Sequence, residues 1–141
     1  MERTVEPVET EDRDRVEREI ELEIGAEEAW AAISDPEQLE RWLADEVELE
    51  PVEGTPATFV VDGEDRAGRI ERVREGRELC FTWDREPGRT SLVELELEPC
   101  VSGIRVKVTE TNFAVEPPAV LMTAWAAPLA ALRARFSLVI A

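Results

Sequence analysis

Glu110 is the residue whose type and position along the sequence best suit it to orient a bound molecule or to act as an acid or base. Ile104, Val106 and Val108 alternate along a predicted strand, and Glu110 continues their parity toward the apolar side. If the strand stays regular, the carboxylate enters the interior and needs a partner there, such as an arginine or a tryptophan N–H. If the strand ends at Val108, Glu110 is exposed to water instead.

The chain contains no histidine, which limits the catalytic and metal-binding roles open to it. It excludes Ser-His-Asp and Cys-His nucleophilic schemes, and it removes the commonest general base near neutral pH and the commonest zinc ligand. Glycine-rich motifs that bind phosphate are also absent. We therefore expect no cofactor and no metal, and we favour a protein that is not an enzyme, with the enzymatic alternative left open.

Aromatic and apolar side chains of one parity line the predicted interior. A sheet bent around a helix can leave a cavity between such side chains, although they can equally form a plain packed core. We predict that the ligand-lining residues are Phe59, Ile70, Phe81, Trp83, Val93, Leu95, Val106, Val108, Glu110, Trp125 and Leu129.

The spacing of apolar residues predicts one α+β domain over residues 16–141. Residues 1–15 are charged and almost without apolar content, so we expect a mobile acidic tail there. Period two predicts an antiparallel sheet, and period 3.6 predicts helices. The expected strands are 16–24, 57–61, 67–73, 79–83, 93–97 and 104–108, and the expected helices are 25–33, 35–43 and 121–139.

Three local signals refine these helices. Ala26, Ala29, Trp30 and Ile33 form the expected buried stripe of the first helix. Asp35 is the expected N-cap of the second helix, before Pro36 and with Gln38 completing a capping box. Pro128 is expected to kink or interrupt the third helix, because proline removes a backbone hydrogen bond.

The net charge of −17 limits the partners of this chain. A field of this sign repels phosphate backbones and anionic membranes, so nucleic-acid binding is not expected. The sequence has no apolar run long enough to span a membrane and begins with a charged segment rather than a signal peptide. We therefore expect no membrane insertion and a cytoplasmic location.

The two cysteines do not predict a disulfide. A hairpin that turns near Pro87 and Gly88 places Cys80 opposite about position 95, about five residues from Cys100. At roughly 3.3 Å per residue the separation is about 16 Å, beyond the roughly 7 Å that a disulfide can bridge. We expect both thiols to be reduced, which fits the cytoplasm.

The order of elements resembles the helix-grip fold. Residues 24–42, from IGAEEAW to LERW, resemble the opening signature of bacterial relatives of the heat-shock protein 90 ATPase activator. Residues 79–83 (LCFTW), residues 104–110 (IRVKVTE) and Trp125 resemble later motifs of that group. The group belongs to the START-like (SRPBCC) superfamily of polyketide cyclases and birch-pollen allergens. The resemblance implies a curved sheet and a long helix enclosing a cavity for lipids, polyketides or other apolar molecules.

Three functions remain open at this point. We favour non-enzymatic binding of an apolar or amphipathic, lipid- or polyketide-like molecule, oriented by Glu110 or a tryptophan N–H. The resemblance implies a second possibility, a co-chaperone-like protein-interaction module whose acidic surface docks on a basic partner. A cyclase-like enzyme using Glu110 as acid or base is the third. A homodimer formed through an exposed sheet edge is also open.

Overall fold

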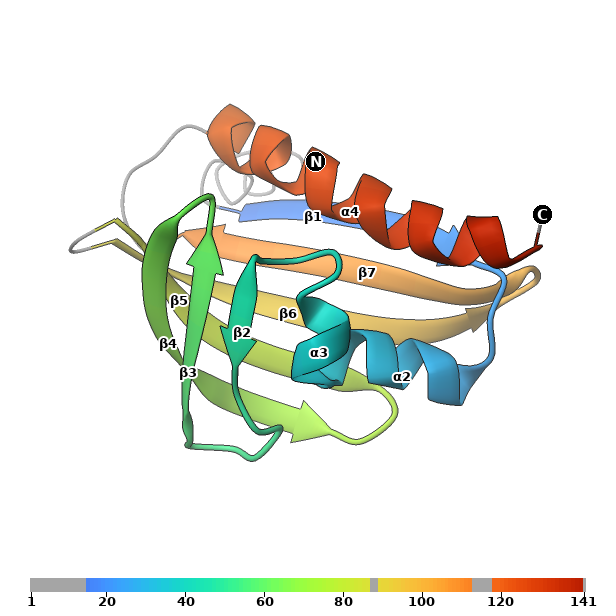
Figure 1. Ribbon diagram of the computed structural model, residues 1–141, viewed down its shortest axis with the longest axis horizontal. Helices are drawn as coiled ribbons and strands as arrows, with labels where there is room; N and C mark the ends of the chain where they lie inside the picture. Colours follow the sequence, from blue (N-terminus) through green and yellow to red (C-terminus); the bar gives the residue numbers. More distant parts are fainter. Residues whose placement is uncertain (1–14, 87–88, 113–117, 141) are drawn as a thin grey trace, which may run out of the picture.

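The computed structural model describes residues 15–86, 89–112 and 118–140 of the chain. Within these ranges, seven strands form one antiparallel sheet in the order β1-β7-β6-β5-β4-β3-β2. The sheet is curved, and helix α4 runs alongside β1 at one of its edges (Figure 1). The strands are β1 (Arg15–Leu22), β2 (Glu46–Glu48), β3 (Pro56–Val61), β4 (Glu64–Arg74), β5 (Glu78–Glu86), β6 (Arg89–Cys100) and β7 (Gly103–Asn112).

The predicted meander is confirmed because alternation separates two faces of the sheet. On β1, Val16, Ile20 and Leu22 are buried, whereas the glutamates between them are exposed. The strand β7 extends four residues past Val108, so the expectation that it ends there is wrong. The strand β2 was not predicted, because three residues are too few for periodicity to stand out. The predicted tail lies outside the described residues, apart from Arg15, which belongs to β1.

Two short helices, α2 (Ala26–Ser34) and α3 (Pro36–Leu39), meet at Asp35. The backbone N–H of Asp35 donates to Ala31 and ends α2, while its side chain accepts the N–H of Glu37 at 3.0 Å and caps α3. The predicted N-cap is therefore confirmed. The Nε1 of Trp42 donates to the carbonyl of Ala32 at 2.9 Å, which fixes the residues after α3 against α2.

Two details of the helices differ from the prediction. In α2, Ala26 is exposed and Trp30 only half-buried, because the helix packs on the sheet through Ala29, Ala32 and Ile33. In α3, the side chain of Gln38 does not complete a capping box, but accepts a hydrogen bond from Arg135 of α4 at 2.9 Å.

The long helix α4 (Pro118–Ile140) is continuous through Pro128, so the proline does not interrupt it. Its buried side chains follow spacings of four, three and four, which keep them on one face. They belong to the same core as the inner side chains of the sheet and of α2. These helix residues are Trp125, Leu129, Leu132 and Phe136.

A bulge sets the faces of β4. The register with β5 shifts between Ile70 and Arg72, so Glu71 is the extra residue. Ile70 therefore lies opposite Phe81 on the inner face, while Arg72 lies opposite Cys80 on the outer face. Close to the bulge, a Cβ on Gly68 would collide with the backbone carbonyl of Thr82, so only glycine permits this approach of the two strands.

Candidate functional site

Glu110 lies at the centre of the candidate site. Its side chain is fully buried, and its two oxygens accept hydrogen bonds from two tryptophans. The Nε1 of Trp83, on β5, donates to Oε2 at 2.9 Å, and the Nε1 of Trp125, on α4, donates to Oε1 at 2.6 Å. The inward orientation expected from parity is thus observed, with indole N–H groups as the partners. The carboxyl joins the sheet to the helix that covers it.

Aromatic rings surround this carboxyl. Trp83 and Trp125 are stacked with centroids 6.1 Å apart and planes inclined by 27°. Phe59 and Phe81 lie 4.8 Å apart, and each meets Trp83 edge to face at 5.2 and 5.3 Å. Such geometries are the favourable ones for aromatic pairs. They place the polar contacts of Glu110 in an environment from which water is excluded.

Two further polar side chains lie beside Glu110 on the inner face. Ser91 pairs with Trp83 on one side and with Asn112 on the other, one row along the sheet from Glu110. Ser91 and Asn112 are both buried. The hydroxyl of Ser91 has no hydrogen-bond partner in the described part of the chain. Ser91, Glu110 and Asn112 are hereafter called the polar cluster.

Arg66 brings a positive charge to the same region. It shares the inner parity of β4 and pairs with Phe59, and its guanidinium carbon lies 4.4 Å from the centroid of the Trp83 ring. A cation at this distance over a tryptophan face is attracted by the ring quadrupole. Trp83 thus contacts both the guanidinium of Arg66 and the indole of Trp125.

All eleven residues predicted to line a cavity are buried and belong to the interior that surrounds Glu110. Two hollows of about 390 Å³ each open at the surface, one beside β2 and β3 and the other near the start of α2. Neither is lined by any of the eleven residues. A role of these residues in binding a ligand therefore stays a prediction.

The sequence prediction missed the other members of this region. Ser91 shares the parity of Val93 and Leu95, and Asn112 continues that of Glu110, so longer predicted strands would have included both. Arg66 could have been found only from its pairing with Phe59, because its own strand carries little apolar alternation.

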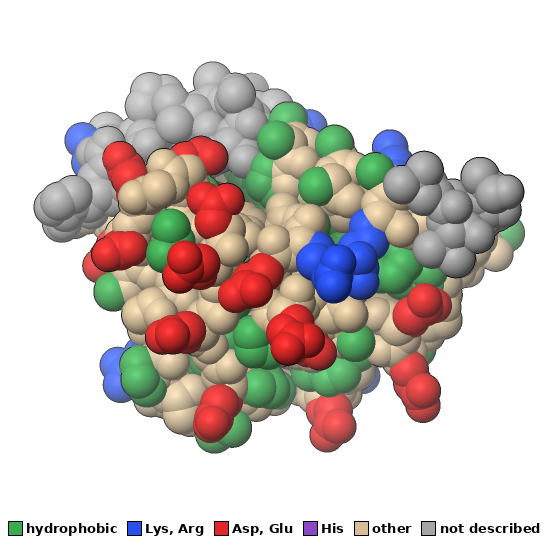
Figure 2. Space-filling model, viewed as in Figure 1, with side chains coloured by type: hydrophobic (Ala, Val, Ile, Leu, Met, Phe, Trp, Pro, Cys, Tyr) green, Lys and Arg blue, Asp and Glu red, His purple; other side chains and the backbone are tan. Residues whose placement is uncertain are grey.

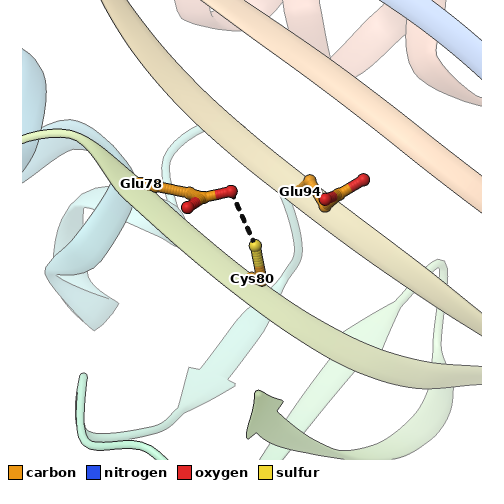
Figure 3. Close-up of side chains that lie close together, drawn as sticks. All are labelled: Glu78, Cys80 and Glu94. Atoms are coloured by element: carbon orange, nitrogen blue, oxygen red, sulfur yellow. Dashed lines mark hydrogen bonds between the residues drawn. The ribbon is translucent and has the colours of Figure 1, made fainter. Parts of the chain in front are cut away.

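A second polar group lies on the outer face of the sheet (Figure 3). Glu78, Cys80 and Glu94 place one potential ligand atom each within 4.8 Å of one another. The Cys80 thiol donates to Glu78 at 3.2 Å, and Arg72 also donates to Glu78 at 3.2 Å. Cys80 lies opposite Glu94, one position from the predicted register, and both cysteines are free as expected.

The contacts of this group favour an ion pair over a metal centre. Burial, and next the hydrogen bond to Glu78, raise the pKa of the Cys80 thiol, so the protonated form is favoured. A metal ligand has to be the thiolate. The charge of Glu78 is meanwhile compensated by Arg72 and by Arg74 at 3.6 Å. This group is best explained as a structural feature of the outer face.

Charged side chains cover much of the remaining surface. Figure 2 shows acidic side chains spread over the face that carries α2, α3 and β2, with few basic ones between them. On the outer face of the sheet, Arg105 of β7 contacts Glu21 of β1 and Glu98 of β6 at 3.1 Å each, so ion pairs connect these neighbouring strands. Among the helices described, none has the length and apolar content that a membrane span requires.

The curved antiparallel sheet and the long C-terminal helix packed against it define an α+β protein of the helix-grip type. The sequence model of the family described as "Activator of Hsp90 ATPase homolog 1-like protein" matches residues 23–137, and the chain belongs to this family. Among curated proteins, none matches the sequence.

Solved structures support the same fold. A protein from Mesorhizobium loti is 21% identical, with a TM-score of 0.74 over 84% of this chain and 93% of that one. An AHSA1-like protein from Aeromonas hydrophila is 23% identical, with a TM-score of 0.67 over 82% and 86% of the two chains. The Aha1 dimer from Colwellia psychrerythraea is 18% identical, with a TM-score of 0.71 over 86% and 95%. Similarity at these identities concerns the fold.

Proposed function

We propose that this protein binds an apolar or amphipathic small molecule between the inner face of the sheet and α4, without changing it covalently. The observation that carries the proposal is the polar cluster in an otherwise aromatic and apolar interior. Ligand sites in proteins have this composition, with mostly apolar walls and a few placed polar groups that orient the ligand. A core that served packing alone would not need a buried carboxyl, or a buried hydroxyl such as that of Ser91, which has no partner among the described residues.

The contacts of Trp125 make α4 the side from which a ligand would enter. Trp125 donates a hydrogen bond to Glu110 and stacks on Trp83. Its side chain extends from α4, whereas those of Glu110 and Trp83 extend from the sheet. A hydrogen bond from Arg135 of α4 to Gln38 of α3 is a further side-chain contact of this helix. A ligand that displaces the Trp125 indole gains contact with Trp83 and the polar cluster while the sheet stays intact.

Native mass spectrometry of the purified protein, compared with its denatured mass, tests the proposal directly. We expect an additional mass that is lost on denaturation, or, for a protein without retained ligand, thermal stabilisation by added amphiphiles. Any ligand bound at this site should also change tryptophan fluorescence. The same spectrum reports whether the protein is a monomer or a dimer.

The matched variants are Trp125→Phe and Trp30→Phe. The first removes an indole that contacts Glu110, and the second removes a half-buried indole on α2 that has no part in the site. The ligand-induced fluorescence change should fall in Trp125→Phe and persist in Trp30→Phe. A protein that carries no extra mass and is stabilised by none of the amphiphiles would contradict the proposal.

The acidic surface favours one alternative, docking on a basic protein partner. The family name includes the activator of the Hsp90 ATPase, so the cell's own chaperone is the partner to test. Purified chaperone should then bind with an affinity that falls steeply as salt rises, because exposed charges are screened. Binding that is unaffected by salt, or no binding, would oppose this alternative.

The cyclase-like alternative has less support from the geometry. Both oxygens of Glu110 already accept indole N–H groups, and a substrate can approach this buried carboxyl only after the ring of Trp83 or Trp125 moves. The arrangement suits a group that orients a bound molecule better than one that transfers a proton.

A further inference from the structure

We infer that two copies of this chain associate through the end of the sheet that carries the β6–β7 hairpin, with the hairpin tip of each copy in a hollow of the other. This interface is separate from the proposed ligand site, because Glu110 and the aromatic residues around it do not line the hollow. Three features of that end carry the inference: an exposed apolar tip, a hollow beside it, and charges that complement each other between two copies.

The tip of the β6–β7 hairpin exposes an apolar side chain. Cys100 and Gly103 form the last pair of the two strands, so Val101 and Ser102 make a two-residue turn. Such turns favour glycine, asparagine, aspartate or serine, and valine has no conformational advantage there. Of the two large apolar side chains exposed in the described residues, Val101 is the more exposed, at 108%. Burial of this side chain against a partner would be favourable.

A hollow of about 390 Å³ lies beside this tip. The hairpin residues Pro99 and Ile104 form one of its walls, and Ala26, the first residue of α2, forms another. Figure 1 shows the hairpin and the start of α2 at the same end of the molecule. Since Leu97 also lines the hollow, its surface is largely apolar. A twofold axis between tip and hollow would place each tip in the hollow of the other copy, which closes the assembly as a dimer.

The charges around the tip and the hollow complement each other. Arg77 lines the hollow, is exposed, and forms no ion pair within the described residues. Glu23 is exposed and also without an ion pair in that part of the chain, and its Cα would lie 3.1 Å from a Cβ on Gly103, so it lies at the base of the tip. Glu98 lines the hollow too, but it already accepts a hydrogen bond from Arg105 at 3.1 Å. In the dimer, Glu23 would therefore meet Arg77 of the partner subunit.

Two other surfaces fit a second copy less well. The hollow beside β2 and β3 is lined by Glu48 and Glu50 and by no cationic residue, so two copies meeting there would bring like charges together. At the edge strand β2, the N–H of Val47 already donates to Glu40 at 3.0 Å, so it is not available to a strand of a second copy. The hairpin end combines an apolar contact with opposite charges, which neither of these surfaces does.

Sedimentation equilibrium at several protein concentrations tests the inference. The buffer contains about 0.3 M sodium chloride, because the net charge of −17 on each copy opposes association and salt screens it. We expect a monomer–dimer equilibrium for the unchanged chain. Val101→Glu should raise the dissociation constant of the dimer at least about tenfold, because the burial of two valines is lost.

The matched control is Val52→Glu. It adds the same charge at the other exposed valine, in the loop between β2 and β3, and should leave the dissociation constant unchanged. Both positions are exposed, so both variants should fold, which circular dichroism checks. An unchanged chain that stays monomeric at every concentration would overturn the inference, and so would a dimer that the two variants weaken equally.

Charge reversal tests the contact between Arg77 and Glu23. Arg77→Glu should weaken the dimer about fivefold or more, because it brings like charges together across the interface. Adding Glu23→Arg should restore most of this loss, since the two charges are then exchanged between the copies. Both side chains are exposed and lack ion pairs in the described residues, so the recovery would come from the interface. A double variant that dimerises no better than Arg77→Glu would overturn this arrangement of the two copies.

Discussion

Each face of the sheet buries one glutamate, but the groups that bind its carboxyl differ between the two faces. On the inner face, Glu110 is fully buried and is held by two neutral indole N–H groups. On the outer face, Glu78 is 6% exposed and is held by arginines, of which Arg72 is 45% and Arg74 63% exposed. The outer glutamate thus keeps its charged partners near water, whereas the inner one accepts hydrogen bonds from two buried indoles.

This difference separates a structural feature from a candidate binding feature. An ion pair with exposed partners is screened by solvent and can be rearranged at little cost. A carboxyl bonded to indoles loses much when a partner leaves, because no water replaces the donor. A molecule that enters on the inner face must therefore replace the hydrogen bonds that it displaces, whereas one that contacts the outer face need not.

The largest effect should follow from Glu110→Ala. It leaves two buried indole donors without an acceptor and creates a cavity, so we expect the free energy of unfolding to fall by about 3–4 kcal/mol. Urea denaturation followed by circular dichroism measures it. Val106→Ala, a purely apolar truncation on the same strand, is the matched control and should cost about 2 kcal/mol. Equal losses for the two variants would mean that the indole bonds contribute little.

A smaller effect is expected for Glu78→Ala on the outer face. Its arginine partners are largely exposed, so the loss should be about 1 kcal/mol or less and should shrink further at high salt. Urea denaturation at two salt concentrations measures both quantities. A loss as large as that of Glu110→Ala would remove the distinction between the two faces.

The smallest effect concerns the reactivity of the cysteines rather than stability. Burial and the hydrogen bond to Glu78 raise the pKa of the Cys80 thiol, so at pH 8 less thiolate is present than in an ordinary cysteine. We expect a thiol reagent to modify the half-buried Cys100 first and Cys80 only on unfolding. A Cys100→Ala variant should therefore show no fast phase. Fast labelling of Cys80 in that variant would show that the outer face opens readily.

Most of the fold could be predicted from the sequence, because alternation and helical spacing record which side chains face the core. Val16, Ile20 and Leu22 on β1, and Trp125, Leu129 and Leu132 on α4, all follow these periods. The failures lie where another contact competes with the local pattern. Trp30 is half-buried although it fits the stripe of α2, and Pro128 lies within a continuous helix.

The candidate site was predicted only in part. Parity left Glu110 either pointing inward, with a tryptophan N–H among its expected partners, or exposed beyond the end of the strand, and the full length of β7 decided for the first. Parity could not identify which tryptophans would reach it, since Trp83 and Trp125 are 27 and 15 residues away in sequence. Ser91 and Asn112 were missed because the predicted strands were too short.

The sequence by itself determined the composition of each face, the absence of histidine and the strongly acidic surface, because these depend only on residue type and period. The tertiary structure decided which polar groups meet. The bulge at Glu71 turns Arg72 toward Cys80, and the packing of α4 brings Trp125 to Glu110. Such contacts depend on strand register and on the position of a helix, which residues distant in the sequence establish together.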